Sequence, residues 1–227
     1  GIWRLIELFN SHDIKATVFT PGRICELYPK AVAAVTANGH EVADHMWEHQ
    51  VPKDLQLEAE HLQKSTQALT ATAGKRPVGT RSWHSQSLLV EEGYIYNSHG
   101  TAHHRPYYVR DKDGENCLLN IPFHYAIDDA MFFSFAWLAS ENAAQRITEP
   151  ERVMDMWWDA FLQQYRQGGY LNVCLHPFVS GRAMRIEALD KLINRMKTLP
   201  GVWFPSCEEI ARHCLENHPA RGSVGVQ

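Results

Sequence analysis

Short strand-like segments alternate with helical segments along this chain, and that alternation restricts the fold more than any other feature of the sequence. Strands that alternate with helices form mainly parallel sheets, either open or closed into a barrel. We therefore expect a single α/β domain over residues 1–219, followed by a flexible tail at 220–227. Helices are expected at 2–9, 25–37, 54–73, 148–167, 185–197 and from 206, and strands at 15–20, 41–43, 77–80, 94–96, 118–122, 170–175 and 202–204.

Two stretches carry the pattern of a capping box, in which a Ser or Thr and a Glu three residues later cap the start of a helix. They are Thr148-Glu149-Pro150-Glu151 and Ser206-Cys207-Glu208-Glu209. A proline in the first turn, as at Pro150, also favours a helix start. Trp157 and Trp158, inside the helix that follows, are interpreted as core or subunit-contact residues rather than a sugar-binding surface.

Composition excludes some classes of protein. The chain has 227 residues with 44% hydrophobic and 21% charged residues, as is usual for a globular domain with a sizeable core. The 22 Lys and Arg against 26 Asp and Glu give a net charge of −4, which argues against a nucleic-acid partner. No apolar run approaches the roughly 20 residues that span a bilayer, so no membrane span is expected.

The five cysteines form no C-x-x-C pair, so neither a disulfide framework nor a thiolate zinc site is indicated. Isolated thiols are typical of a reducing compartment. The first residues also lack the charged leader and apolar stretch of a secretory signal. We therefore expect a cytoplasmic protein.

Two histidines, His45 and His49, lie four residues apart directly after the expected strand at 41–43. On a helix or in a tight loop, this spacing places both imidazoles on one side, where one metal ion can bind both at about 2.0–2.1 Å. The segment is not the H-E-x-x-H of metalloproteases, because Glu48 precedes the second histidine rather than following the first. A pair of surface or core histidines is the alternative interpretation.

Two further side chains are expected at the carboxyl ends of strands. His176 follows the strand expected at 170–175, where an imidazole suits a general acid, or where it only hydrogen bonds a backbone carbonyl. Arg81 follows the strand expected at 77–80 and can hold a carboxylate through two hydrogen bonds. Because chemistry collects beyond the carboxyl ends of parallel strands, these residues are candidates for one site.

Motifs that recur in one enzyme family are spread over nearly the whole chain. They are Lys15-Ala16-Thr17-Val18-Phe19, Pro21-Gly22-Arg23, Tyr28-Pro29, Asn38-Gly39-His40-Glu41-Val42, His45-x-x-x-His49, Lys75-Arg76-Pro77-Val78-Gly79-x-Arg81, Gly93-Tyr94-x-Tyr96, Arg105-Pro106-Tyr107, Ile127-Asp128-Asp129, Leu175-His176-Pro177 and Ser180-Gly181-Arg182. This combination resembles the polysaccharide deacetylase (NodB-homology) family, in the branch with peptidoglycan-deacetylase-like proteins and a metal-independent allantoinase. The resemblance implies a distorted (β/α) barrel of fewer than eight regular strands, often assembled as homotetramers.

The resemblance also implies residue roles. His45 and His49 match the two metal-ligand histidines of the family, His176 matches the general acid, and Arg81 matches the arginine that orients the catalytic aspartate. The implied reaction is hydrolysis of an amide, typically an N-acetyl group on an amino sugar. A divalent metal ion, with zinc favoured, would polarise the carbonyl and lower the pKa of bound water.

Three features depart from the family pattern. The aspartate-rich first motif, which supplies the base and the third metal ligand, normally precedes the helix at 2–9. We therefore expect this sequence to be N-terminally incomplete and to lack the first strand of the barrel. The connection from Arg81 to Gly93 is shorter than in the family and lacks the usual proline. His103 and His104 stand where acidic residues are often found.

Four other residues are second-rank candidates for substrate binding. Asp128 and Asp129 are either active-site carboxylates or local caps of a turn, and the residue types alone do not decide between these roles. His84 and His124 are placed in the same group.

Three functions remain open at this point. The first is a metal-dependent deacetylase, and the second is a ring-opening hydrolase of a small cyclic amide such as allantoin or an imide. His49 favours a metal enzyme, since the metal-independent allantoinase pattern lacks the second histidine. The third is a catalytically inactive barrel that serves as an oligomeric scaffold.

Overall fold

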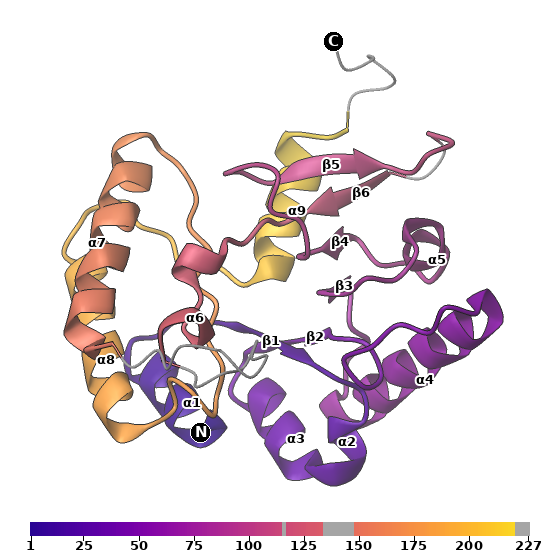
Figure 1. Ribbon diagram of the computed structural model, residues 1–227, viewed down its shortest axis with the longest axis horizontal. Coiled ribbons are helices and arrows are strands. Elements are labelled where there is room, and N and C mark those ends of the chain that lie inside the picture. The colour runs from indigo at the N-terminus through magenta and orange to yellow at the C-terminus, as the bar shows by residue number, and fades with distance from the viewer. Residues whose placement is uncertain (115–116, 134–147, 221–227) are drawn as a thin grey trace, which may run out of the picture. The chain divides into compact units, whose positions relative to one another are not determined.

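The computed structural model describes residues 1–114, 117–133 and 148–220, which form a mixed α/β structure with a six-stranded sheet (Figure 1). The helices are α1 (Ile2–Ser11), α2 (Ile24–Leu27), α3 (Pro29–Ala37), α4 (Leu55–Ala73), α5 (Gln86–Glu91), η1 (Tyr125–Ile127), α6 (Ala130–Phe133), α7 (Pro150–Arg166), α8 (Ala183–Lys197) and α9 (Cys207–Asn217). The strands are β1 (Thr17–Thr20), β2 (Glu41–Asp44), β3 (Gly79–Thr80), β4 (Tyr96–Asn97), β5 (Tyr107–Arg110) and β6 (Cys117–Asn120).

These residues divide into two compact units. The first, here called the helical unit, consists of Gly1–Ile14 and Phe123–Phe204. The second, here called the sheet unit, consists of Lys15–Pro122 and the chain from Pro205 onward, and it contains strands β1 to β6. The expectation of a single domain over 1–219 stays a prediction, and residues 221–227 of the expected tail lie outside the described residues.

The sheet has the order β1-β2-β3-β4-β6-β5, and its neighbours are parallel except for the antiparallel pair of β5 and β6. The register aligns Thr20 with Asp44, Asp44 with Thr80, and Thr80 with Asn97. The carboxyl ends of the parallel strands therefore lie along one edge of the sheet. Among the described residues the sheet stays open, and this mixed α/β fold with a parallel sheet confirms the predicted distorted-barrel class.

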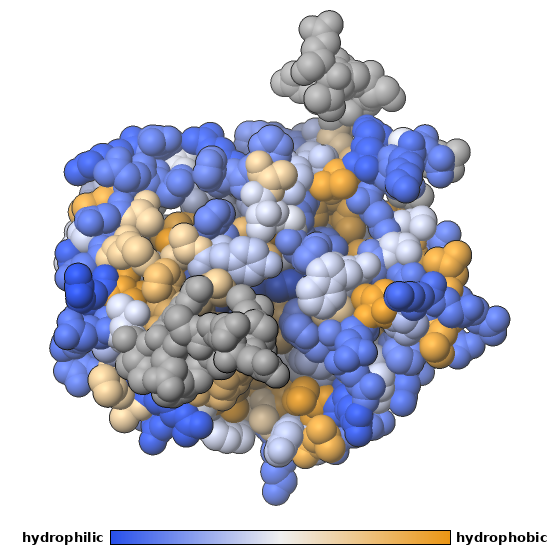
Figure 2. Space-filling model, in the orientation of Figure 1, coloured by the Kyte–Doolittle hydropathy of each residue, from blue (hydrophilic) through white to orange (hydrophobic). Residues whose placement is uncertain are grey.

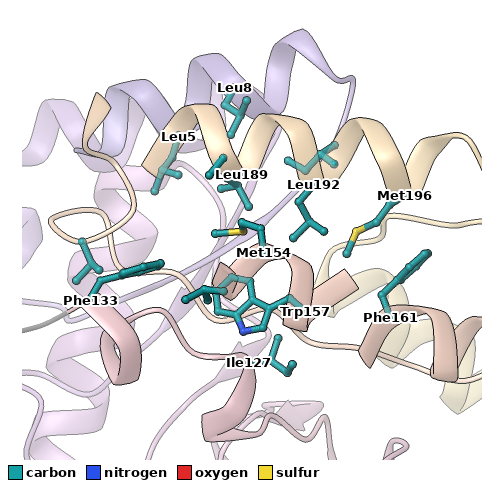
Figure 3. Close-up of a cluster of buried hydrophobic side chains, with 14 of the residues drawn as sticks. Leu5, Leu8, Ile127, Phe133, Met154, Trp157, Phe161, Leu189, Leu192 and Met196 are labelled. Atoms are coloured by element: carbon teal, nitrogen blue, oxygen red, sulfur yellow. The ribbon is translucent and has the colours of Figure 1, made fainter. Parts of the chain in front are cut away.

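The core of the helical unit lies between α1, α7 and α8 (Figure 3). Trp157 is fully buried at its centre, and its indole Nε1 donates a hydrogen bond to the Ala126 carbonyl at 2.9 Å. The core interpretation of Trp157 is thereby confirmed. The side chains around it include Leu5, Leu8, Ile127, Phe133, Met154, Phe161, Leu189, Leu192 and Met196.

In the sheet unit, helix α4 buries one of its faces. Leu62 and Leu69 are fully buried, whereas Leu55 at the start of the same heptad pattern is exposed. Asp54 caps this helix by accepting a hydrogen bond from the Leu57 N–H at 2.9 Å, and Gly74 ends it with a left-handed φ of 73°. The predicted start and end of this helix are confirmed.

Several expected elements differ from the structure. The helix expected at 25–37 is two helices, because Pro29 has no N–H to continue α2 and instead begins α3. The strand expected at 170–175 is wrong, since only Cys174 there forms an isolated bridge with Asp128. The strand expected at 202–204 is wrong as well. Apolar side chains of both segments pack against the core of the helical unit without entering a ladder of strand hydrogen bonds.

The two predicted capping boxes have different outcomes. At α9, Ser206 accepts a hydrogen bond from the Glu209 N–H, and the Glu209 side chain accepts one from the Ser206 N–H, so the box is confirmed. At α7, the N-cap is Glu149 rather than Thr148, and it makes no side-chain capping bond. Pro150 occupies the first turn as expected, so the helix forms although the predicted box is wrong.

The five cysteines, which all lie among the described residues, are thiols rather than disulfide partners, as expected. Among the helices that the structure describes, none combines the length and the apolar character needed to cross a bilayer.

Candidate active site

His45 follows β2 and Arg81 follows β3, so the register of the sheet brings both to its carboxyl edge. The His45 Nδ1 lies 2.5 Å from the Arg81 carbonyl oxygen. Because a carbonyl only accepts, Nδ1 must carry the proton in this bond, and in the neutral ring Nε2 then keeps its lone pair. This is the arrangement that typically orients a metal-binding imidazole.

His49 lies in a tight turn rather than on a helix. Its φ of 60° and that of Met46, 67°, are left-handed, and buried Met46 and Trp47 anchor the turn in the sheet unit. The turn brings the His49 ring edge-on to His45, with 4.6 Å between ring centroids. Of the two geometries open in the sequence, the structure has the loop.

Asp44, directly before this pair, is fully buried and holds the turn in place. Its carboxylate accepts hydrogen bonds from the Ser65 hydroxyl at 2.5 Å, the Thr80 hydroxyl at 2.9 Å and the Met46 N–H at 3.1 Å. Burial raises the pKa of this carboxyl, although these three donors act to lower it. Asp44 is therefore a structural anchor of this turn.

The Arg81 guanidinium holds the end of β4. Its Nε donates to the Ser98 carbonyl at 3.0 Å, and one terminal nitrogen donates to the Ser98 hydroxyl at 3.1 Å. The guanidinium carbon also lies 4.5 Å from the centroid of the Phe19 ring. Arg81 is therefore rigidly positioned, and its expected action on an aspartate stays a prediction.

An aromatic row continues from His49 through residues that the sequence analysis did not single out. The Trp83 indole lies edge-on to His49 at 5.5 Å and to His99 at 5.3 Å, measured between centroids. Burial, together with the nearby Arg81 charge, lowers the pKa of His99. The sequence could have indicated His99 as a site residue through its position just after a strand, which is also the position of His45.

His84 is fully buried beside Glu58 of α4, with 3.2 Å between its Nδ1 and Glu58 Oε1. The same carboxylate accepts hydrogen bonds from the Ser85 N–H at 2.6 Å and the Ser85 hydroxyl at 3.0 Å. Glu58 thus ties the segment after β3 to α4. This contact gives His84 a structural role beside the expected role in substrate binding.

In the helical unit, His176 and Asp129 form a carboxylate–imidazole pair. The His176 Nδ1 lies 2.7 Å from Asp129 Oδ1, and the His176 backbone N–H donates to Asp129 Oδ2 at 2.9 Å. Asp129 is fully buried, whereas the His176 side chain is partly exposed. An ionised carboxylate on Nδ1 leaves Nε2 as the atom that can give or take a proton, which is what acid–base catalysis requires.

Asp128 has two kinds of contact. Its Oδ1 accepts a hydrogen bond from the Ala130 N–H at 2.9 Å, and the same oxygen lies 3.7 Å from His176 Nδ1. Burial raises the pKa of Asp128, and the His176 charge opposes that shift. Ligand atoms of Asp128, Cys174 and His176 all lie within 4.8 Å of one another, so this cluster could also hold a metal ion.

The remaining second-rank candidate, His124, is exposed. Its Nδ1 accepts a hydrogen bond from the Ala126 N–H at 3.1 Å, which caps η1. The structure thus gives His124 a capping contact, and its expected role in substrate binding stays a prediction.

Known proteins resemble the chain in sequence. Residues 1–86 match the family model described as polysaccharide deacetylase. A peptidoglycan deacetylase of Helicobacter pylori is 28% identical over 254 residues, which span 97% of this chain and 86% of that protein. A polysaccharide deacetylase of Schizosaccharomyces pombe, described as putative, is 25% identical over 96% of this chain and 74% of its own length.

Solved structures resemble it as well. A probable polysaccharide deacetylase of Pseudomonas aeruginosa is 29% identical with a TM-score of 0.85, covering 97% of this chain and 74% of that one. The PuuE allantoinase is 27% identical, with the same TM-score and coverage. Fold and matches together define a hydrolase that acts on carbon–nitrogen bonds other than peptide bonds. Within that class, the chain resembles the polysaccharide deacetylase family, whose model matches residues 1–86.

Proposed function

We propose that the protein is a metal-dependent deacetylase that hydrolyses the amide bond of an N-acylated amino sugar. The observation that carries the proposal is the His45 ring, whose Nδ1 is bound to the Arg81 carbonyl beside the His49 ring. Two adjacent imidazoles, one with its tautomer fixed through Nδ1, suit a divalent metal ion that accepts nitrogen ligands.

The donor set fits zinc, although cobalt, nickel and manganese also accept imidazole. His45 and His49 would hold the ion. When bound, such an ion polarises the carbonyl of the amide that is cleaved. The Asp128, Cys174 and His176 cluster is the weaker candidate, because His176 Nδ1 already faces the Asp129 carboxylate.

His176 is assigned the proton that the departing amine needs. Its Nε2 donates this proton, while Asp129 holds Nδ1 and stabilises the imidazolium before the transfer. Arg81 keeps its expected role of orienting a carboxylate.

Metal analysis of the purified protein tests the proposal. We expect about one equivalent of divalent metal in the parent protein and none in the His45→Ala/His49→Ala variant. Cys174→Ser is the matched control, because it removes a thiol ligand of the other candidate cluster. Metal loss in Cys174→Ser with retention in the double variant would contradict the assignment, and no metal in metal-supplemented parent protein would contradict metal dependence.

Ring opening of a small cyclic amide is the second candidate function. The observation that favours it is the similarity to the PuuE allantoinase over 97% of this chain. Turnover of N-acetylglucosamine oligomers and of allantoin by the same metal-loaded preparation separates the two. We expect acetate release from the oligomers, whereas turnover of allantoin alone would replace the first proposal by the second. Turnover of neither substrate would favour the inactive scaffold.

A further inference from the structure

A carboxylate, a thiol and an imidazole lie together in the helical unit, on Asp128, Cys174 and His176. We call these three side chains the thiol cluster. The Cys174 N–H donates to the Ile127 carbonyl at 2.9 Å, and the Asp129 N–H donates to the Cys174 carbonyl at 3.1 Å. The Cys174 side chain also forms a hydrogen bond with the Asp128 carboxylate. These bonds fix the carboxylate and the thiol next to each other.

The spacing of the thiol cluster is close to that of a tetrahedral zinc site. Zinc bonds of about 2.0–2.3 Å to oxygen, nitrogen and sulfur place the ligand atoms about 3.3–3.6 Å apart. Asp128 Oδ1 and His176 Nδ1 are already 3.7 Å apart, and all ligand atoms of the cluster lie within 4.8 Å of one another. A closure of at most about 1.5 Å therefore brings the three ligands to bonding positions.

The residue types of the thiol cluster select the kind of cation. Thiolate and imidazole ligands suit Zn²⁺ and Co²⁺, whereas Mg²⁺ prefers a shell of oxygen ligands. Asp128 and Cys174 are 6% and 9% exposed, so their negative charges act on an ion with little screening by water. The His176 side chain is 28% exposed, which leaves an approach for the ion from its side of the cluster.

Binding at the thiol cluster has a cost that binding at His45 and His49 does not have. The Asp129 carboxylate holds His176 Nδ1 at 2.7 Å, so an ion on Nδ1 must displace it. An ion on Nε2 instead occupies the atom assigned to proton donation. The Cys174 thiol also releases its proton to solvent when it becomes a ligand. We therefore expect the thiol cluster to fill only when metal is in excess.

We propose that Asp128, Cys174 and His176 form an inhibitory site for a thiophilic divalent cation such as Zn²⁺, in addition to the metal held by His45 and His49. An ion bound through either nitrogen of His176 removes this imidazole from proton transfer. Excess metal therefore slows the hydrolysis that a first equivalent supports. Binding at the cluster stands on its geometry alone, whereas the inhibition rests on the proposed function.

Titration of the His45→Ala/His49→Ala variant with Co²⁺ tests binding apart from catalysis. A thiolate bound to Co²⁺ gives a ligand-to-metal charge-transfer band in the near ultraviolet. We expect this band to appear in the double variant and to be lost when Cys174→Ser is added. Cys117→Ser is the matched control, because Cys117 is a partly buried thiol of the sheet unit outside the cluster, and its addition should leave the band unchanged.

Asp128→Asn, added to the same double variant, is a second test that keeps the thiol and the shape of the side chain. Loss of an outer partner of a metal ligand typically lowers metal affinity 10- to 100-fold, so loss of a charged ligand should weaken Co²⁺ binding at least about tenfold. Circular dichroism confirms that each variant is folded.

The rate of acetate release from an N-acetylglucosamine oligomer at rising Zn²⁺ tests the inhibition. We expect the rate of the parent to rise up to one equivalent and to fall in excess, while the same excess of Mg²⁺ added to the zinc-loaded protein has no effect. Each variant is compared with its own maximal rate. Cys174→Ser and Asp128→Asn should raise the inhibitory Zn²⁺ concentration at least about tenfold, and Cys117→Ser should leave it as in the parent.

Absence of the band, or a band that survives Cys174→Ser, would overturn the site. Equal inhibition of parent, Cys174→Ser and Asp128→Asn by Zn²⁺ would overturn its inhibitory role, as would hydrolysis that excess Zn²⁺ does not slow. Any of these together with metal-dependent hydrolysis leaves the proposed function intact. A band that depends on Cys174, without hydrolysis under any metal condition, supports the site and removes the proposed function.

Discussion

Asp129 determines which nitrogen of His176 can exchange a proton, because the buried carboxylate lies 2.7 Å from Nδ1. Replacement of His176 by Ala removes the proposed proton donor, and we expect kcat on an N-acetylglucosamine oligomer to fall by roughly 10²- to 10⁴-fold. Asp129→Asn keeps the shape but not the charge, so it should lower kcat with little change in KM. Steady-state kinetics measures both effects.

His213→Ala is the matched control for this pair, since His213 is an exposed histidine on α9. It should leave kcat unchanged. Full activity of Asp129→Asn would show that the carboxylate only supports the fold around α6, where Asp129 also accepts the His176 backbone N–H.

The sequence predicts the positions of some candidate site residues but not of others. The strand-end position of His45 and the spacing to His49 placed both correctly beside each other. The sequence could not show which of Asp128 and Asp129 would pair with His176, because both belong to the same motif. Only the fold places the Asp129 carboxylate against His176 Nδ1, while Asp128 accepts from the Ala130 N–H. His99 carries no local motif, and its contact with Trp83 depends on the pairing of β3 with β4.

At the scale of elements, the Glu58 and His84 pair joins α4 to the segment after β3. The Glu58→Gln substitution replaces a carboxylate that accepts from His84 and Ser85 by an amide with one acceptor oxygen, and we expect the free energy of unfolding to fall by roughly 1–3 kcal/mol. Glu60→Gln, an exposed change on the same helix, should alter it by less than about 0.5 kcal/mol. Urea unfolding measures the free energy of unfolding of both variants. Equal stability of the two would show that the Glu58 and His84 contact does not stabilise the fold.

Glu41 joins β2 to three other elements. Its carboxylate accepts hydrogen bonds from the Thr17 hydroxyl of β1 at 2.5 Å, the Tyr96 hydroxyl of β4 at 2.7 Å and the Glu208 N–H of α9 at 2.9 Å. Burial nevertheless raises the pKa of the Glu41 carboxyl above its ordinary value of 4.5, although these donors act to lower it. The folded state therefore holds this proton more tightly than the unfolded chain.

A carboxyl with a raised pKa contributes stability that is fully present below pH 4.5 and is lost as pH rises through its folded value. We expect the free energy of unfolding to fall between pH 4.5 and 7.5 by more in the parent than in Glu41→Gln, which cannot ionise. Urea titrations at several pH values check this. Parallel pH profiles of parent and variant would mean that Glu41 does not contribute to the slope.

Elements with a local signal were predicted more successfully than those that need a distant partner. The start of α9 was readable because Ser206 and Glu209 cap it within one turn. The segment at 170–175 has the apolar character of a strand, but a strand exists only where another strand pairs with it, and Cys174 alone meets Asp128. The short strand β5 was not predicted, because it is a strand only through its antiparallel pairing with β6, which the local sequence does not reveal.

At the scale of the whole molecule, alternation of strands and helices predicted the fold class because parallel strands need crossover connections. It could not predict the order β1-β2-β3-β4-β6-β5, which reverses β5 and β6 at the edge. The division into a helical and a sheet unit could not be predicted from the sequence either, because the helical unit combines two segments that are far apart in the chain, residues 1–14 and 123–204.

We expect the protein to assemble as a homotetramer, as its resemblance to the family implies. Hydrophobic residues reach the surface in separate places on the face drawn in Figure 2. In the helical unit, Trp3 is 56% and Met184 is 69% exposed, and an interface between copies would cover such side chains. We expect light scattering to give about four times the chain mass of 26.0 kDa.

Charge substitutions locate the interface. Trp3→Glu and Met184→Glu should each reduce the mass in solution, because a carboxylate buried between copies would lose its hydration. Leu55→Glu places the same charge on an exposed leucine of the sheet unit and should leave the assembly unchanged. Dissociation by Leu55→Glu alone would move the interface to the sheet unit, and a parent mass of 26.0 kDa would show that these apolar side chains remain exposed in a monomer.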